Sequence, residues 1–200
     1  MTKDSKIKMG SRIQEANASY RPAKLTYDDY LSLPNDGRRY EIIKGELYMS
    51  PAPSTDHQSF LLNLATQLHL INEEARLGKL FLAPTDVILS FTDIVQPDLI
   101  FIAKENFDKI TQKNIVGSPD LGVEIISETT HKVDRELKKQ LYQTYRVREY
   151  WLVDLNTRRV EVWEIKKGKY RLFHVFNSRQ SLSSPNFPAL KVDLKKCFEG

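Results

Sequence analysis

The sequence predicts an α/β or α+β fold in which helices cover the faces of a mixed central sheet. The first observation is the order of segments: a short helix, a hairpin, a long amphipathic helix, several strands, another helix, and strands joined by tight turns. The second is a pair of short runs rich in Ile, Val and Leu, at residues 99–102 and 121–126, with the composition of buried strands. Together these are typical of a sheet packed between helices.

The composition predicts a globular protein of ordinary size. Of 200 residues, 40% are hydrophobic and 28% are charged, and the formal net charge is +4. This mild basic excess permits binding to a polyanion but argues little for it. No segment approaches the roughly 20 apolar residues of a membrane span, and the N-terminus lacks the apolar core of a secretory signal. Cys197 is the only cysteine, so an internal disulfide is excluded, and we expect a cytoplasmic protein.

The chain is expected to consist of a flexible leader and one folded domain. Residues 1–22 are polar without apolar periodicity, which predicts the leader, and residues 23–200 form the domain. Thr26 is a capping candidate for a short helix that the turn at 34–37 ends.

An N-terminal hairpin is predicted around Lys44 and Gly45, between residues 39 and 49. If Ile43 faces Glu46 across the turn, alternation puts Glu41 and Glu46 on one face. A solvated hairpin face would explain these two acids as well as a functional role does.

A long helix is predicted over residues 56–77, with Ser54 or Thr55 as its cap and Gly78 at its C-terminus. His57 lies on its apolar side, where a histidine is more often a packed residue than a ligand or base, so we leave it outside the site. The predicted buried stripe contains His57, Leu61, Leu64, Leu68, Ile71 and Ala75.

The remainder of the chain is predicted to contain most of the sheet. Residues 104–114 read as a short helix with loop, and a second helix is expected over 132–147. Four separate strands are predicted at 80–83, 87–91, 99–102 and 121–126. A C-terminal antiparallel meander is predicted from three more strands, at 149–154, 159–165 and 169–175. A short edge strand is expected at 190–194.

Two acidic residues lie in or beside apolar strands, where a charged side chain is unusual. Glu124 lies among Val123, Ile125 and Ile126, and an unpaired carboxylate there would cost several kcal/mol. It therefore needs a cationic partner, either a metal ion or a structural arginine. Asp98 begins another apolar run directly after a proline, where it could equally be a turn residue.

Spacing decides which aspartate can join Glu124. Asp120 precedes it by four residues on the same strand, roughly 13 Å at about 3.3 Å per residue, which is too far to share one ion. Asp98 on a neighbouring strand, about 4.8 Å away, can meet it. We therefore expect Asp98 and Glu124 to form the pair.

A lysine on the following helix could complete this pair. With Val133, Leu137, Leu141 and Thr144 as the buried face, Lys138 falls about 80° from its centre at about 100° per residue, whereas Lys132 and Lys139 point away. An ion pair between Lys138 and Asp134 is the structural alternative.

Pro97-Asp98, the in-strand Glu124 and a nearby lysine resemble the PD-(D/E)XK nuclease superfamily. More closely, the chain is similar over roughly residues 25–175 to the bacterial family of putative restriction endonucleases. The residues that carry this likeness are Arg39-Tyr40-Glu41, Gly45-Glu46-Leu47, Ser50-Pro51-Ala52-Pro53, His57-Gln58, Gln96-Pro97-Asp98, Pro119-Asp120-Leu121, Glu124-Ile125-Ile126-Ser127, Asp134 with Lys138, and Glu149-Tyr150-Trp151-Leu152-Val153-Asp154.

The resemblance implies a restriction-endonuclease-like core, dependence on Mg²⁺ (or Mn²⁺), and hydrolysis of DNA phosphodiester bonds. Asp98, Glu124 and the backbone carbonyl of Ile125 would hold the metal, with Glu41 as a further candidate. The superfamily's lysine position is occupied by Ile126, so Lys138 is the candidate catalytic lysine.

The expected partners are DNA and, by analogy, a second copy in a homodimer. Basic residues near the site that could contact the phosphate backbone include Lys132, Arg135 and Lys139. The alternative is a catalytically inactive nucleic-acid-binding or assembly module on the same fold, which the missing in-line lysine favours.

Overall fold

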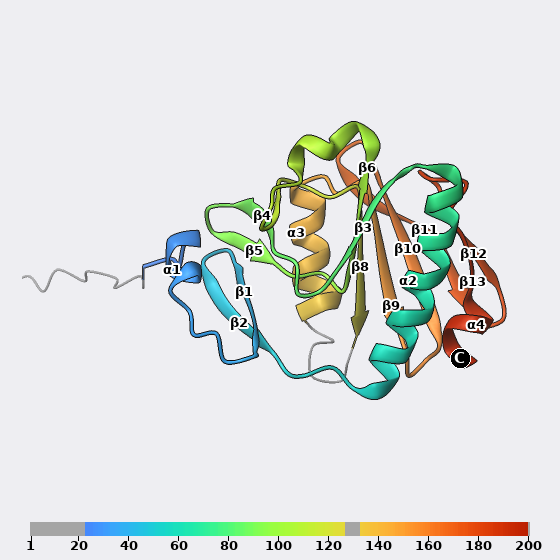
Figure 1. Ribbon diagram of the computed structural model, residues 1–200, viewed down its shortest axis with the longest axis horizontal. Helices are drawn as coiled ribbons and strands as arrows, with labels where there is room; N and C mark the ends of the chain where they lie inside the picture. Colours follow the sequence, from blue (N-terminus) through green and yellow to red (C-terminus); the bar gives the residue numbers. More distant parts are fainter. Residues whose placement is uncertain (1–22, 127–132, 200) are drawn as a thin grey trace, which may run out of the picture.

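The fold is a mixed α+β arrangement built on a six-stranded sheet with helices on both faces (Figure 1). This computed structural model describes residues 23–126 and 133–199, and the leader predicted at 1–22 lies outside them. The sheet has the order β11-β10-β9-β8-β6-β3. Its strands are β3 (Gly78–Leu82), β6 (Leu99–Ala103), β8 (Leu121–Ile126), β9 (Glu149–Asp154), β10 (Arg159–Lys166) and β11 (Lys169–Asn177).

Within this sheet, β8 and β9 are parallel and the other neighbouring pairs are antiparallel. The predicted meander is confirmed, since β9, β10 and β11 follow one another as antiparallel neighbours. Alternation divides the strands between two cores. Leu121, Val123 and Ile125 of β8 face one core, whereas Ile126 faces the other.

A second sheet of five strands has the order β2-β1-β5-β4-β7. Its strands are β1 (Arg39–Ile43), β2 (Glu46–Ser50), β4 (Val87–Ser90), β5 (Asp93–Val95) and β7 (Ile115–Val116), and a separate small pair is formed by β12 (Ser181–Ser183) and β13 (Lys191–Asp193). The predicted hairpin register is confirmed, because Ile43 pairs with Glu46 and Glu41 with Tyr48. Glu46 is exposed, but Glu41 is buried, so a solvated face is the wrong explanation for Glu41.

The helices are α1 (Tyr27–Leu31), α2 (Thr55–Ala75), the 3-10 helix η1 (Lys104–Lys109), the π-helix η2 (Val133–Lys138), α3 (Lys139–Thr144) and α4 (Leu194–Glu199). Thr26 caps α1 as predicted, through a capping box with Asp29. Within the described part of the chain, no helix is long and apolar enough to cross a bilayer.

Helix α2 covers one face of the large sheet, with Leu61, Leu64 and Leu68 in its core, and Ser54 caps it. The expected cap at Gly78 is wrong. The helix ends instead at Arg76, which takes a left-handed conformation (φ 51°), and Gly78 is the first residue of β3. A Cβ at Gly78 would overlap the carbonyl oxygen of Ile102, so the close approach of β3 to β6 requires the glycine.

The helix predicted over 132–147 is shorter and begins with a π segment. A π-helix forms hydrogen bonds between residues i and i+5, so each residue turns through less than the 100° of an α-helix. Side-chain directions predicted at 100° per residue are therefore no longer correct after η2. Thr144, expected on the buried face, is exposed, whereas Tyr142 is fully buried. Lys138 is the last residue of the π segment and is buried.

Gly78→Ala should lower the free energy of unfolding by about 1 to 3 kcal/mol, the usual cost of overpacking, because the added methyl meets backbone rather than a movable side chain. Gly122→Ala in β8 is the matched control, since its Cβ would lie 3.9 Å from the Tyr142 ring, an ordinary contact. Urea denaturation of both variants checks this. Equal losses would contradict the role given to Gly78.

Candidate active site

The register of β6 against β8 brings the two predicted acids together. Leu99 pairs with Val123 in this antiparallel pair, and one further step places Asp98 opposite Glu124. The backbone N–H of Ile125 donates to Oδ2 of Asp98 at 2.8 Å. Both carboxylates are almost completely buried. Asp98 itself directly precedes β6, the strand that neighbours β8, rather than lying within it.

Asp120 has a structural role at the other end of β8. Its carboxylate accepts hydrogen bonds from the backbone N–H of Ala103 at 2.8 Å and from the side chain of Asn106 at 2.9 Å, and Arg148 lies 3.2 Å away. These partners stabilise the buried charge without any ligand.

Asp98 is held from three elements. Nη1 of Arg39, on β1, lies 3.0 Å from Oδ1, and Nε2 of His57, in the first turn of α2, lies 3.3 Å from the same oxygen. Burial by itself would raise the pKa of Asp98, but the interaction with His57, the charge of Arg39 and the amide of Ile125 lower it to about 2. These contacts therefore stabilise the fold above about pH 4, and their contribution is lost as the pH falls through 2.

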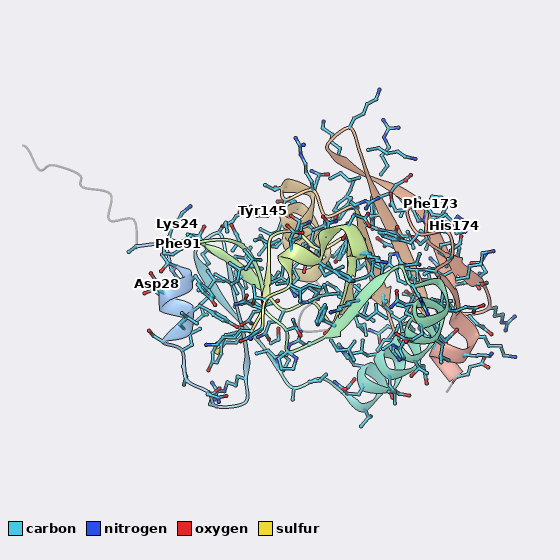
Figure 2. All side chains as sticks on the ribbon, turned by 45° about the horizontal axis from the view of Figure 1, so that its top comes forward. Lys24, Asp28, Phe91, Tyr145, Phe173 and His174 are labelled. Atoms are coloured by element: carbon cyan, nitrogen blue, oxygen red, sulfur yellow. The ribbon has the colours of Figure 1, made fainter. Side chains whose placement is uncertain are left out.

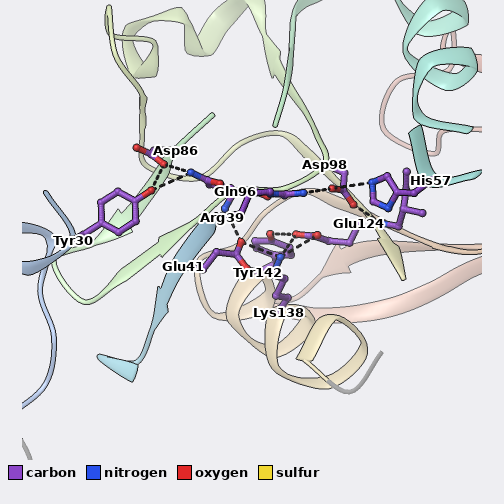
Figure 3. Close-up of polar contacts among 11 residues, drawn as sticks. Tyr30, Arg39, Glu41, His57, Asp86, Gln96, Asp98, Glu124, Lys138 and Tyr142 are labelled. Atoms are coloured by element: carbon purple, nitrogen blue, oxygen red, sulfur yellow. Dashed lines mark hydrogen bonds and ion pairs between the residues drawn. The ribbon is translucent and has the colours of Figure 1, made fainter. Parts of the chain in front are cut away.

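Glu124 is held by Lys138 and Tyr142 (Figure 3). The ammonium of Lys138 lies 3.0 and 3.1 Å from the two carboxylate oxygens, and the Tyr142 hydroxyl donates to Oε1 at 2.6 Å. Burial, followed by the negative charges of Glu124 and Glu41, raises the pKa of Tyr142 well above its ordinary value, so this hydroxyl remains a donor.

Glu41 shares the same lysine. Its Oε1 lies 3.0 Å from Nζ of Lys138 and accepts the backbone N–H of Gln96 at 2.7 Å. The Gln96 side-chain amide then donates to Asp86 at 2.8 Å and to the Tyr30 hydroxyl at 3.0 Å. A continuous polar network therefore runs from α1 to the interior of the large sheet (Figure 3).

Several buried charged side chains gather in this cluster. Among the described residues that make these contacts, three buried carboxylates (Glu41, Asp98 and Glu124) face the two permanent cations Arg39 and Lys138. His57 lies beside them, 3.3 Å from Oδ1 of Asp98.

The donor chemistry fits a magnesium ion held by few protein ligands. No three His, Cys, Asp or Glu side chains gather as a metal cluster within 23–126 and 133–199. Mg²⁺ usually takes one or two carboxylates and keeps several waters, so Asp98 and Glu124 suffice as a donor set. Glu41 already bonds Lys138 and Gln96, and Ile125 contacts the site through its amide.

The three basic residues predicted to contact DNA are placed differently. Lys132 lies outside the described residues. Arg135 forms an ion pair with Glu161 at 2.8 Å, and the ammonium of Lys139 lies over the Trp163 ring. Both residues therefore contact β10 within the same chain, and the prediction that Lys139 points away from the sheet is wrong.

Sequence reasoning missed several members of the site. His57 was interpreted as a packed residue and is buried, and its Nε2 also lies 3.3 Å from Oδ1 of Asp98. Tyr142 lies within the helix predicted over 132–147, and its sequence neighbours gave no sign that its hydroxyl would reach Glu124. Arg39 appeared in the family-like Arg39-Tyr40-Glu41, but nothing in its local sequence indicated that it would reach Asp98.

The fold is a mixed sheet in which Asp98, directly before β6, lies opposite Glu124 of β8. The chain belongs to the Uma2 family, described as "Putative restriction endonuclease", whose model matches residues 27–195. No curated protein matches the sequence. Among solved structures, the fold is similar to a "putative nuclease belonging to DUF820" from Anabaena variabilis, with a TM-score of 0.73 and 19% identity over 88% of this chain and 98% of the other.

Lys138→Met should lower the free energy of unfolding by about 3 to 5 kcal/mol, because it leaves Glu41 and Glu124 buried without their shared cation. Adding Glu41→Gln and Glu124→Gln should recover most of that loss, since neutral side chains need no cation. Lys139→Met, one residue further along, is the control and should cost less than about 1 kcal/mol. Chemical denaturation measures all three, and an unaffected Lys138→Met protein would contradict the ion-pair assignment.

Proposed function

We propose that this protein is a metal-dependent endonuclease that hydrolyses DNA phosphodiester bonds. The observation that carries the proposal is the meeting of Asp98 and Glu124 across β6 and β8 with the Lys138 ammonium 3.0 Å from Glu124. The family resemblance predicted two carboxylates and a lysine, and the closeness of these three side chains supports the proposal. Membership of a family described as "Putative restriction endonuclease" supports the same conclusion.

Asp98 and Glu124 are the residues that would hold Mg²⁺ or Mn²⁺. Such an ion, when bound, lowers the pKa of a coordinated water and stabilises negative charge on a phosphate. Asp98 is suited to this role because its carboxyl group, with a pKa of about 2, is ionised at every physiological pH. Tyr142 helps to fix the orientation of Glu124 through its hydroxyl.

Lys138 supplies the positive charge that phosphoryl transfer needs. Its ammonium is buried and held between Glu41 and Glu124, so its position is fixed before substrate arrives. A preorganised cation stabilises developing charge more effectively than one that must reorganise. We therefore assign Lys138 to stabilisation of the phosphorane-like transition state, and Glu41 to holding Lys138.

DNA and a second copy of the chain are the proposed partners. Phosphate contacts from basic side chains would be independent of sequence and weakened by salt. Pairing into a homodimer and a cytoplasmic location stay predictions, and analytical ultracentrifugation tests the first of them.

The first test is nicking of supercoiled plasmid DNA with Mg²⁺ or Mn²⁺. Asp98→Asn and Glu124→Gln should each lower the rate by at least about 100-fold, because each removes an anionic ligand without changing side-chain size. Glu46→Gln, an exposed acid on the hairpin, is the matched control and should retain the parent rate. Undiminished nicking in both site variants would remove Asp98 and Glu124 from the mechanism.

A second function is favoured by one specific observation. The Lys138 ammonium already compensates Glu41 and Glu124, so the cluster could persist without metal as an assembly or nucleic-acid-binding module. Titration calorimetry with Mn²⁺ distinguishes the two. The nuclease proposal predicts saturable heat that Asp98→Asn abolishes, whereas no heat at millimolar metal would support the inactive module.

A further inference from the structure

His57 is a buried polar residue whose side chain reaches the site from the opposite layer of the fold. It lies in the first turn of α2, where its backbone N–H donates to Oγ of Ser54 at 3.2 Å. Its side chain is only 10% exposed, and Nε2 lies 3.3 Å from Oδ1 of Asp98. Figure 3 shows the imidazole facing Asp98 on the side opposite Glu41 and Lys138.

Nε2 of His57 has no well-aligned hydrogen-bond partner among the described residues. Leaving a buried polar atom without such a partner costs about 1 to 3 kcal/mol. The neighbouring helix positions that face the core are Phe60, Leu61 and Leu64, so an apolar side chain would suit packing alone. Packing therefore does not explain the imidazole of His57, and its contact with Asp98 is the remaining explanation for a polar side chain at this position.

The contacts around Asp98 indicate what that role is. The Ile125 amide holds Oδ2, while Arg39 and His57 share Oδ1. Arg39 also donates to the carbonyl oxygen of Gln96, so it is tied to the loop before β6. His57 is the contact that comes from α2 and limits rotation of the carboxylate from that side.

We propose that His57 is a positioning residue that orients the Asp98 carboxylate for binding a divalent cation shared with Glu124. This inference rests on the proposed metal-dependent nuclease function and deepens it. Groups that orient a metal ligand typically change metal affinity or activity 10- to 100-fold when they are removed. His57 acts through Asp98 and makes no contact with the reacting phosphate.

The test compares three substitutions at this position by Mn²⁺ titration calorimetry. His57→Gln keeps a nitrogen donor at about the reach of Nε2, whereas His57→Asn shortens the side chain and His57→Leu removes the donor. We expect His57→Asn and His57→Leu to weaken Mn²⁺ binding about 10- to 100-fold, and His57→Gln to restore it to within about 3-fold. His69→Leu, an exposed histidine on the same helix, should bind as the parent does.

Circular dichroism and thermal melting accompany each titration, so that affinities are compared only between folded proteins. The Gln and Asn variants are both polar and differ by one methylene, which keeps the comparison decisive if His57→Leu does not fold. Parent-like affinity in His57→Asn would overturn the inference and leave the nuclease proposal standing. Absence of Mn²⁺ binding by the parent would instead overturn the proposed function, and the positioning role with it.

Discussion

The antiparallel register between β6 and β8 is the constraint on which the site depends. It places Asp98 opposite Glu124, and a slip of one residue would move one of the two acids to the other face of the sheet. The register is firmly specified because both strands are buried along their whole length. The buried Glu124 then requires a cation, and this requirement ties η2 and α3 to the sheet through Lys138 and Tyr142.

The smaller sheet takes part in the same cluster. Arg39 and Glu41 are two residues apart on β1, so alternation points both side chains to one side. One contacts Asp98 and the other contacts Lys138. The N-terminal hairpin is therefore an integral part of the candidate site, and side chains from both sheets surround the same charges (Figure 3). Figure 2 draws the side chains of the described residues on the whole fold.

Much of this arrangement could be predicted from local sequence. The apolar runs predicted the buried strands, and the capping residue Thr26 predicted the start of α1. The sequence intervals between Asp98, Asp120 and Glu124 were enough to choose Asp98 over Asp120 as the partner of Glu124. Lys138 was selected by helical geometry. The observed π segment before it shows that the angular count was only approximate, as the exposure of Thr144 confirms.

Long-range contacts were the part that local patterns could not supply. Arg39 lies 59 residues from Asp98 in the sequence, and a lone arginine in a strand carries no signal of its partner. His57 has the spacing of a core residue and is one, so its contact with Asp98 depends on where α2 begins relative to β6. The left-handed end of α2 falls at Arg76, whereas Gly78, the expected glycine cap, allows the close packing of β3 against β6.

The most direct test of the central claim is a crystal structure of the protein soaked in Mn²⁺, with anomalous diffraction to locate the metal. The account predicts a peak within about 2.1 to 2.3 Å of carboxylate oxygens from both Asp98 and Glu124. A fully occupied Mn²⁺ site elsewhere, or no peak beside these two residues at saturating metal, would contradict it.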